Sequence, residues 1–272
     1  MVGAKALYTA QLAVNSQIGS PRGLPQFAHD GWRLAPSDVP LSPPTWGSQQ
    51  REANMTTIDI PRNTIIHGDC VQVLPQLQAG SVDFALTDPP YLARYKSRDG
   101  RGVPNDDNDR WLNPAFAALY RVLAPDSFAV SFYGWPRADR FMAAYRAAGF
   151  RVVGHFVCPK RYTSSAAFVS YRHECAHLLA KGEPAKPQRP IADVLPWDYT
   201  ANKLHPTQKP LSTLKPLVLA FSRPGGLVLD PFAGSGSSLL AAQQLGRNWL
   251  GVELDAGYHA IASTRLAVAG AA

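Results

Sequence analysis

The stretch that decides the fold is SVDFALTDPPY, residues 81–91. It opens with a short apolar run around Val82 and Phe84, which is typical of a strand buried in a parallel sheet. Pro89 and Pro90 cannot continue a hydrogen-bond ladder, so the sequence predicts that the strand ends there and that a rigid loop follows. Because open α/β sheets bind ligands at the carboxyl ends of their strands, we expect a binding site at this loop.

The loop carries groups suited to a planar ring that bears an amino group. Asp88 contributes a carboxylate, Pro89 and Pro90 contribute main-chain carbonyls, and Tyr91 offers an amphipathic ring for stacking. The same residues also suit an ordinary turn after a core strand, with Asp88 as a helix cap. A second motif is needed to separate these two interpretations.

A similar strand and loop lie near the carboxyl terminus. Residues 226–230, GLVLD, predict a buried strand, and residues 231–238, PFAGSGSS, predict a glycine-rich turn before a helix. Gly234 and Gly236 allow the backbone to approach a ligand, which then faces the free amides of the helix N-terminus. The turn lacks the lysine of a P-loop and the spacing of GxGxxG, so a phosphate or dinucleotide site is disfavoured.

Two carboxylates flank this turn. Asp230 ends the first strand and can hold a cation, and Glu253 follows the strand predicted at residues 249–252. Their separation is close to the roughly 20-residue interval at which a carboxylate reaches ribose hydroxyls in nucleotide-binding sheets. A ligand with both an amino-acid end and a ribose fits the pair, and S-adenosyl-L-methionine is such a ligand.

Composition and charge bound the class of protein. The 272 residues can bury one large core. Contents of 46% hydrophobic and 17% charged residues are typical of a soluble protein. No apolar run approaches the roughly 20 residues of a membrane span. Three scattered cysteines favour a reducing, cytoplasmic setting. Residues 137–189 hold ten basic and three acidic side chains, which favours a polyanionic partner such as nucleic acid over a merely solvated basic face.

Apolar periodicity predicts an alternation of strands and helices. We expect strands at residues 63–67, 82–86, 127–133, 151–157, 172–180, 226–230 and 249–252. We expect helical segments at residues 71–77, 111–123 and 138–148, from residue 211, and at residues 239–245. This alternation predicts an α/β fold with a doubly wound, mostly parallel sheet.

Three further segments do not follow that pattern. Residues 1–55 are rich in Pro, Gly and Ser, which predicts a loosely ordered extension before a folded domain at residues 56–272. Residues 92–110 are polar and long for a connection, which predicts a mobile loop beside the site. Residues 173–177, HECAH, match the HExxH pattern of zinc proteases, but that chemistry needs a helix and a third ligand. Their flanks favour a strand, so we expect no metal site and keep a zinc hydrolase as an alternative.

Three motifs occur together in an order that one family shares. They are DPPY at residues 88–91, HPTQKP at residues 205–210 and DPFAGSGSS at residues 230–238, with Glu253 beyond. Over about residues 58–266 the chain therefore resembles the beta group of amino-methylating DNA methyltransferases. The resemblance implies a seven-stranded sheet of the S-adenosylmethionine-dependent methyltransferase type. It also implies DNA as partner and direct, in-line transfer of a methyl group to an exocyclic base amine after base flipping.

The resemblance implies roles for individual residues. Asp88 and the Pro89 carbonyl would hold the target amine, Pro90 shapes the loop, and Tyr91 would stack on the base. The residues implied to bind the cofactor are Asp69, Thr207, Lys209, Asp230, Phe232, Gly234, Gly236, Ser237 and Glu253. The basic residues expected to contact DNA are Arg94, Lys96, Lys160, Arg161 and Arg172.

Within the cofactor set the implied contacts differ. Asp230 would lie near the amino group of the methionine part, and Thr207 and Lys209 near its carboxylate. Glu253 would bind the ribose, and Asp69 the amino group of the adenine ring. Phe232, Gly234 and Gly236 would wrap the methionine part.

Asp88 as the first residue of the DPPY motif favours N6 of adenine as the target, with N4 of cytosine as the alternative. A methyltransferase of protein glutamine would be expected to carry Asn there. An inactive DNA-binding relative remains an alternative of another class. Residues 182–203 stand where the beta group often has a larger recognition region, so a short site, relaxed specificity and a homodimer that shares readout stay open. The chain carries no nuclease motif, so a companion endonuclease, and with it a restriction-modification system, stays open.

Overall fold

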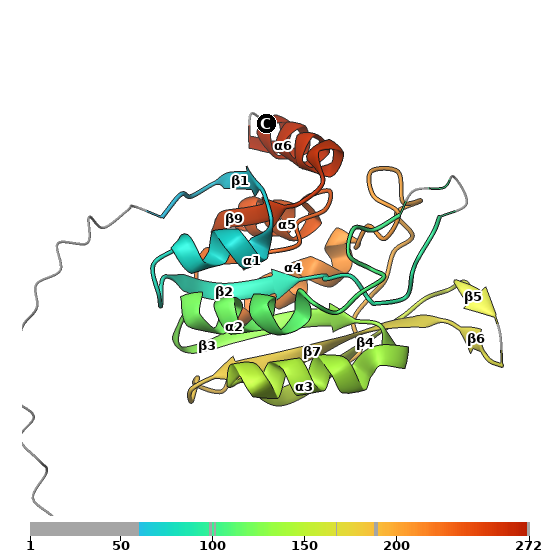
Figure 1. The fold of residues 1–272 in the computed structure, drawn as a ribbon, viewed down its shortest axis with the longest axis horizontal. Helices are drawn as coiled ribbons and strands as arrows, with labels where there is room; N and C mark the ends of the chain where they lie inside the picture. The colour runs from blue at the N-terminus through green and yellow to red at the C-terminus, as the bar shows by residue number, and fades with distance from the viewer. Residues whose placement is uncertain (1–59, 98–99, 101, 167, 188–189, 271–272) are drawn as a thin grey trace, which may run out of the picture. The chain divides into compact units, whose positions relative to one another are not determined.

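The computed structural model describes residues 60–97, 100, 102–166, 168–187 and 190–270, so the extension expected at residues 1–55 lies outside the described residues. The core is a seven-stranded sheet in the order β1-β9-β8-β2-β3-β7-β4. Its strands are β1 (Thr64–His67), β2 (Val82–Thr87), β3 (Leu123–Tyr133), β4 (Arg151–Pro159), β7 (His173–Lys181), β8 (Leu227–Asp230) and β9 (Asn248–Glu253). A two-stranded hairpin, β5 (Ser165–Ala166) and β6 (Ser170–Tyr171), extends beyond the sheet (Figure 1).

The sheet is mostly parallel. From β1 through β9, β8 and β2 to β3, each strand runs parallel to its neighbour, whereas β7 is antiparallel to both β3 and β4. The predicted seven-stranded, mostly parallel α/β sheet is therefore confirmed. Because β9, β8 and β2 run in the same direction, their carboxyl ends meet at one rim of the sheet.

Helices cover both faces of the sheet (Figure 1). They are α1 (Cys70–Val73), α2 (Leu112–Val122), α3 (Ala138–Ala148), α4 (Leu211–Phe221), α5 (Ser237–Gln244) and α6 (Ala256–Gly270), with 3-10 turns η1 (Leu74–Gln76) and η2 (Trp135–Arg137). Buried side chains of α1, α2 and α3 share one apolar cluster, and those of α4, α5 and α6 share the other. The predicted doubly wound arrangement is confirmed. None of the described helices has the length and apolar character that a membrane crossing requires.

Strand β2 explains why its sequence is apolar rather than alternating. Ala85 belongs to the cluster under α1 to α3, whereas Phe84 and Leu86 belong to the cluster under α4 to α6. A strand buried on both faces needs apolar residues at successive positions. Asp88 follows the last residue of β2, and Pro89 and Pro90, which come next, are buried.

The segment expected to carry DNA recognition also completes the sheet. The Val157 amide donates to the Asp193 carbonyl (2.8 Å), and the Leu195 amide donates to the Val157 carbonyl (2.9 Å). Leu195 is buried in the cluster under α4 to α6. Part of residues 182–203 therefore covers the outer edge of β4, where unpaired backbone groups would otherwise be exposed.

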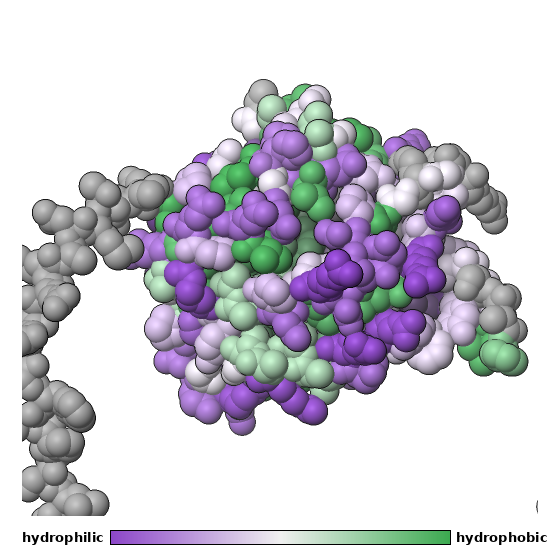
Figure 2. Space-filling model, viewed as in Figure 1, coloured by the Kyte–Doolittle hydropathy of each residue, from purple (hydrophilic) through white to green (hydrophobic). Residues whose placement is uncertain are grey.

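Exposed apolar side chains mark the turn of the β5–β6 hairpin. Phe168 and Val169 lie there with their side chains in solvent. Figure 2 shows apolar surface at the tip of this hairpin, whereas the rest of the visible face mixes polar and apolar residues. The hairpin follows the end of β4, so it stands at the same rim as the DPPY loop.

Candidate active site

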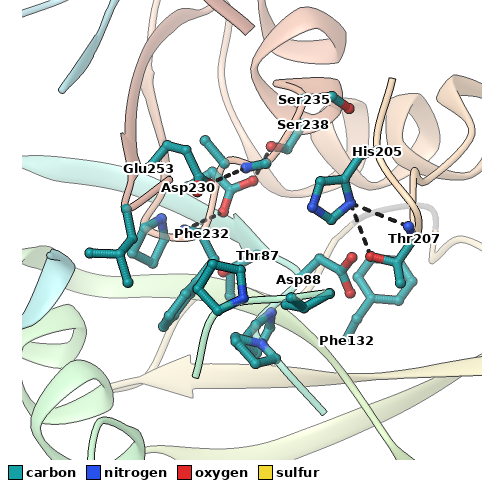
Figure 3. A pocket seen from close by; sticks show the side chains of 18 of the residues that line it. Thr87, Asp88, Phe132, His205, Thr207, Asp230, Phe232, Ser235, Ser238 and Glu253 are labelled. Carbon is teal, nitrogen blue, oxygen red and sulfur yellow. Dashed lines mark hydrogen bonds between the residues drawn. The ribbon is translucent and has the colours of Figure 1, made fainter. Parts of the chain in front are cut away.

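Two loops that are far apart in the sequence meet at the carboxyl rim of the sheet. Strands β2 and β8 pair directly, with Phe84 opposite Val228 and Ala85 opposite Leu229. The DPPY loop and the glycine-rich loop therefore leave the sheet side by side and line one cavity (Figure 3). The residues predicted from sequence that line this cavity are Asp69, Asp88, Pro89, Pro90, Tyr91, Thr207, Lys209, Asp230, Phe232, Gly234, Ser237 and Glu253.

The glycine-rich turn depends on two positive φ angles. Gly234 has φ +51° and Gly236 has φ +75°, in the left-handed region that glycine adopts without strain. A Cβ on Gly234 would lie 3.4 Å from the His205 ring, on the cavity side. A Cβ on Gly236 would instead lie 3.2 Å from the Cβ of Ala262 in α6. Gly236 therefore packs the turn closely against α6. Its contact with a cofactor stays a prediction.

Asp230 carries a carboxyl group in a desolvated position at the end of β8. It accepts hydrogen bonds from the Phe232 amide (3.0 Å) and from the Ser238 hydroxyl (Figure 3). Burial nevertheless raises the pKa of Asp230 to about 7, because these donors offset only part of the desolvation. A cationic group beside it would restore the charged form.

Glu253 ends β9, and Asp69 lies two residues beyond the end of the neighbouring strand β1. Glu253 is buried and accepts from the Gly234 amide (2.6 Å) and from the Asp255 amide (2.8 Å), which ties the end of β9 to the glycine-rich turn. Burial raises the pKa of Glu253 despite these donors. Asp69 accepts a hydrogen bond from the Val71 amide (2.9 Å) and so caps α1. Asp69 also lines the cavity.

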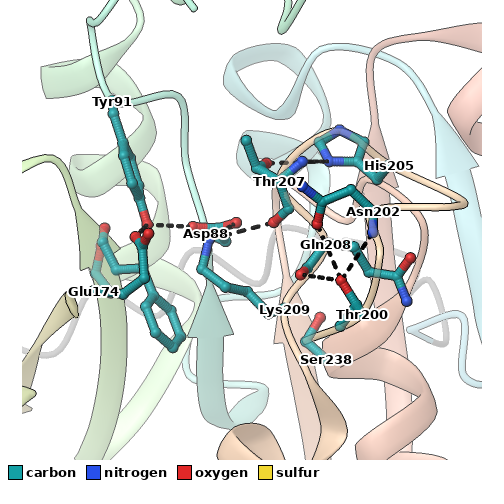
Figure 4. Close-up of polar contacts among 12 residues, drawn as sticks. Asp88, Tyr91, Glu174, Thr200, Asn202, His205, Thr207, Gln208, Lys209 and Ser238 are labelled. Atoms are coloured by element: carbon teal, nitrogen blue, oxygen red, sulfur yellow. Dashed lines mark hydrogen bonds and ion pairs between the residues drawn. The ribbon is translucent and has the colours of Figure 1, made fainter. Parts of the chain in front are cut away.

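Lys209 lies next to the carboxylate of the DPPY loop. Its Nζ donates to Asp88 Oδ2 (2.6 Å), and the side chain is 5% exposed (Figure 4). The resemblance implied that Lys209 seats a cofactor carboxylate, but here its partner is Asp88. Thr207 also lines the cavity, and its hydroxyl and the Nδ1 of His205 are 3.1 Å apart.

Asp88 and Tyr91 are linked within the DPPY loop. The Tyr91 hydroxyl is 2.9 Å from Asp88 Oδ1 and 3.3 Å from Glu174 Oε2 (Figure 4). Burial raises the pKa of Asp88, although the adjacent Lys209 ammonium opposes that shift. Burial and the two neighbouring carboxylates raise the pKa of Tyr91 well above its usual range. At neutral pH, Tyr91 is therefore a neutral hydrogen-bond donor.

Glu174 is a site residue that the sequence analysis did not assign. It belongs to HECAH, which forms the start of strand β7 as expected, so His173 and His177 stand roughly 13 Å apart rather than one helical turn apart. His177 stacks on Tyr133 (centroids 4.2 Å apart), and burial lowers its pKa to about 4. Among the described residues, no cluster of three His, Cys, Asp or Glu side chains is arranged to hold a metal ion.

Within the described part of the segment 137–189, the basic side chains do not form one surface. Arg151 pairs with Ala180 and Pro159 with His173 in the β4–β7 ladder, so Arg151 and Lys181 lie at the end of the sheet opposite the active site. The nitrogen Nζ of Lys181 there donates to two backbone carbonyls of α2 and β3. The charge excess seen in the sequence is therefore divided between the two ends.

The residues expected to contact DNA differ in exposure. Arg94, Lys96, Arg161 and Arg172 are exposed. Lys160 is buried and ion-paired with Glu174, so the expectation that it contacts phosphates is corrected. Lys160 comes directly after the end of β4, and its side chain points into the interior rather than toward solvent.

The polar loop at residues 92–110 is held at its base. Asp106 is buried and accepts hydrogen bonds from the amides of Ala93 (3.1 Å) and Tyr95 (2.6 Å). The indole of Trp111 donates to the Asn105 carbonyl (3.0 Å). Motion of this loop remains a prediction, and its residues 98–99 and 101 lie outside the described part of the chain.

The fold and the site together define an α/β protein of the methyltransferase type, with two functional loops at the rim where β8 and β2 end. The N6/N4 DNA methylase family model, described as DNA methylase, matches residues 82–264. The chain belongs to this family.

Named relatives agree with that assignment. The chain is 55% identical over 202 residues to the protein named "Putative methylase YubD" of Escherichia coli (strain K12), which covers 74% of this chain and 89% of that protein. It is 30% identical over 245 residues to the DNA adenine methyltransferase YhdJ of the same strain, covering 76% of this chain and 83% of YhdJ. The crystal structure of the M1.HpyAVI–SAM complex has the same fold, with a TM-score of 0.60 and 23% identity over 75% of this chain and 98% of that one.

Proposed function

We propose that this DNA methylase transfers a methyl group from S-adenosyl-L-methionine to the exocyclic N6 amino group of adenine in DNA. The observation that carries the proposal is the direct pairing of β2 with β8, which brings the DPPY loop and the glycine-rich loop to one cavity. One loop suits a base amine and the other suits an amino-acid cofactor. A methyl group has to pass only between neighbouring strand ends.

The residues around the glycine-rich loop fit such a cofactor. Gly234 leaves a space that a Cβ would fill, and the desolvated carboxyl of Asp230 suits the cofactor's ammonium. Glu253 and Asp69 lie at the adjoining strand ends, where they would hold the ribose and the adenine ring. Phe232 packs edge-on against Trp111 (centroids 5.0 Å apart), which gives the cavity an apolar wall. When bound, S-adenosyl-L-methionine supplies a methyl group on an electrophilic sulfonium.

The DPPY loop would prepare the base amine. The lone pair of an exocyclic amine is delocalised into the ring, so the amine is a weak nucleophile. Asp88 and the Pro89 carbonyl would accept its two hydrogens and favour a pyramidal nitrogen, while Tyr91 would stack on the ring. Lys209 keeps a positive charge beside Asp88 and so favours the carboxylate form that accepts hydrogen bonds.

Adenine is preferred over cytosine for two reasons. Asp stands at position 88, as in adenine enzymes that the chain resembles, and the relative YhdJ is named a DNA adenine methyltransferase. Cytosine N4 is the second candidate, because the family includes enzymes of both kinds.

The DNA contacts belong to the same proposal. Arg94, Lys96, Arg161 and Arg172 would contact phosphates at the rim. Since part of residues 182–203 covers β4, we propose that few of these residues read bases and that the recognition site is short. Cys70, Cys158 and Cys175 are free and buried, in keeping with the proposed cytoplasmic setting.

Methyl transfer from labelled cofactor to unmethylated DNA tests the proposal. The wild-type protein is expected to label DNA, and digestion to nucleosides is expected to give N6-methyladenine. Asp88→Ala should lower the rate by about 100-fold or more, because an acceptor in the transition state is lost. The variant should still bind the cofactor, as titration would measure.

Three outcomes would contradict the proposal in different ways. N4-methylcytosine as the product would move the target to cytosine. DNA binding without cofactor binding would indicate an inactive relative. An unchanged rate for Asp88→Ala would place the chemistry elsewhere.

A further inference from the structure

A chain of hydrogen bonds and ion pairs runs from Lys209 through Asp88, Tyr91 and Glu174 to Lys160. Lys209 Nζ is 2.6 Å from Asp88 Oδ2, Asp88 Oδ1 is 2.9 Å from the Tyr91 hydroxyl, and that hydroxyl is 3.3 Å from Glu174 Oε2 (Figure 4). Glu174 Oε1 is in turn ion-paired with Lys160. Each carboxylate thus has its own lysine, and the tyrosine lies between the two carboxylates.

The hydroxyl of Tyr91 has one hydrogen and two acceptors within reach. A phenol donates a single hydrogen bond, so Tyr91 cannot satisfy Asp88 and Glu174 fully at the same time. The shorter distance favours Asp88 in this structure. Asp88, however, already accepts from Lys209 through its other oxygen. A base amine that approaches Asp88 therefore competes with Tyr91.

We propose that Glu174 is a positioning residue that receives the Tyr91 hydroxyl when the target amine binds Asp88. With this second acceptor, Tyr91 can release Asp88 without leaving a buried hydroxyl unpaired, and its ring stays in place for stacking. Lys160 holds Glu174 in position from the end of β4. The inference rests on the proposed function and adds to it a residue outside the DPPY motif.

The burial of the Lys160–Glu174 pair supports a role beyond packing. The Lys160 side chain is 6% exposed and lies over the Trp197 ring (5.3 Å), while Glu174 remains largely buried. Removing two charges from water is costly, and a buried ion pair is often no more stable than apolar residues of the same size. At the other end of β7, Glu183 pairs with Arg151 in solvent, where this cost is small. The buried pair is the one that reaches Tyr91.

A double-mutant cycle tests whether Glu174 acts through Tyr91. Glu174→Met removes the acceptor and Tyr91→Phe removes the donor, and single-turnover methyl transfer is measured for each variant and for both together. We expect each single variant to be roughly 10-fold slower, with the double variant no slower than the slower single one. Glu174→Gln, which keeps an acceptor oxygen, should recover most of the rate. Cofactor affinity should stay unchanged throughout.

The cycle has a matched control and a guard against misfolding. Glu183→Met makes the same change at the far end of β7 and should leave the rate unaltered. If Glu174→Met fails to fold, Lys160→Met combined with Glu174→Met removes both charges of the pair and replaces it in the cycle. Effects that multiply in the double variant would overturn the proposal, because Glu174 would then act independently of Tyr91.

A measurement without DNA or cofactor separates this inference from the proposed function. With tyrosines labelled with carbon-13 at Cζ, the Tyr91 resonance is the one that is lost in Tyr91→Phe. Glu174→Met should shift that resonance, whereas Glu183→Met should not. An unshifted Tyr91 resonance would show that the hydroxyl does not sense Glu174 and would end the proposal, whatever the methylation assay gives.

Discussion

Asp230 is almost fully buried at the end of β8, and burial raises the pKa of its carboxyl group from the ordinary acidic range to about 7. In the unfolded chain the same group loses its proton near pH 4. Between these two values the folded protein binds more protons than the unfolded one, so the free energy of unfolding falls as pH rises through the window. This sign is opposite to that of a carboxylate held by a salt bridge.

Asp230→Asn should remove that pH dependence. Denaturant unfolding at pH 5 and pH 8 would measure it, and we expect the wild-type free energy of unfolding to fall relative to the variant by on the order of 1–3 kcal/mol. The exposed Asp198 serves as the control, because Asp198→Asn should leave the wild-type dependence intact. Identical pH profiles for wild type and Asp230→Asn would contradict a desolvated Asp230.

At the scale of the element, the end of β3 shapes the DPPY loop. Gly134 follows β3, and a Cβ added to it would lie 2.8 Å from the Cβ of Tyr91 and 3.2 Å from the Tyr91 carbonyl oxygen. Contacts under 3.0 Å to a packed loop cannot be relieved by the movement of a flexible side chain. The DPPY loop can therefore occupy its place only because residue 134 has no side chain.

Gly134→Ala should displace the DPPY loop and slow methyl transfer by about 10- to 100-fold, since small misplacements of catalytic groups cost rate steeply. Cofactor affinity should change little, because the glycine-rich loop leaves a different strand. Single-turnover rates and cofactor titration would measure the two effects. Gly102→Ala, whose added Cβ would meet nothing closer than 3.8 Å, is the control. A normal rate for Gly134→Ala would mean that the loop tolerates the shift.

The sequence predicted elements whose pattern is local. Continuous apolar runs located β2 and β8, and helical spacing located α2 and α3 within a residue or two. Strand β3 was expected to begin at residue 127, because Pro125 and Asp126 have the composition of a turn. The strand begins at Leu123 instead. Val82 of β2 pairs with Leu123 and Phe84 pairs with Phe128, so the strand passes Pro125 and Asp126 as an irregularity in the ladder. That pairing leaves no signal in the local sequence.

The residues of the candidate site also fall into two groups, those that local sequence predicts and those that only the tertiary structure reveals. Asp88, Asp230 and Glu253 could be predicted because each ends a buried strand. The contacts of Lys209 with Asp88 and of Glu174 with Tyr91 could not, since they join loops that only the tertiary structure brings together. Glu174 lies within HECAH, residues 173–177. The match of this segment to a zinc motif pointed to its histidines rather than to Glu174.

On the scale of the whole molecule, two exposed arginines that we propose as DNA contacts lie at the rim of the site. Arg161 follows β4 and Arg172 precedes β7, and the two are linked because the Lys160 amide donates to the Arg172 carbonyl (2.6 Å). Both side chains are exposed. Arg151, by contrast, lies at the opposite end of the sheet, paired with Glu183.

Replacing Arg161 and Arg172 together with Ala should flatten the salt dependence of DNA binding. If each contacts one phosphate, the slope of log K against log salt should decrease in magnitude by about 2, while cofactor affinity is kept. Binding titrations over a range of salt concentrations would measure the slope. Arg151→Ala should leave it unchanged. An equal slope for the double variant and wild type would remove these arginines from the DNA interface.

The pairing of β2 with β8 has a consequence for the ancestry of the chain. A ladder of backbone hydrogen bonds between β2 and β8 holds the glycine-rich loop beside the DPPY loop. The two loops do not need to be close in the covalent chain. A gene could therefore be cut and rejoined so that either loop is translated first, and the same chemistry would survive the rearrangement. The succession of motifs along such a chain is a record of descent, and the reaction itself places no demand on it.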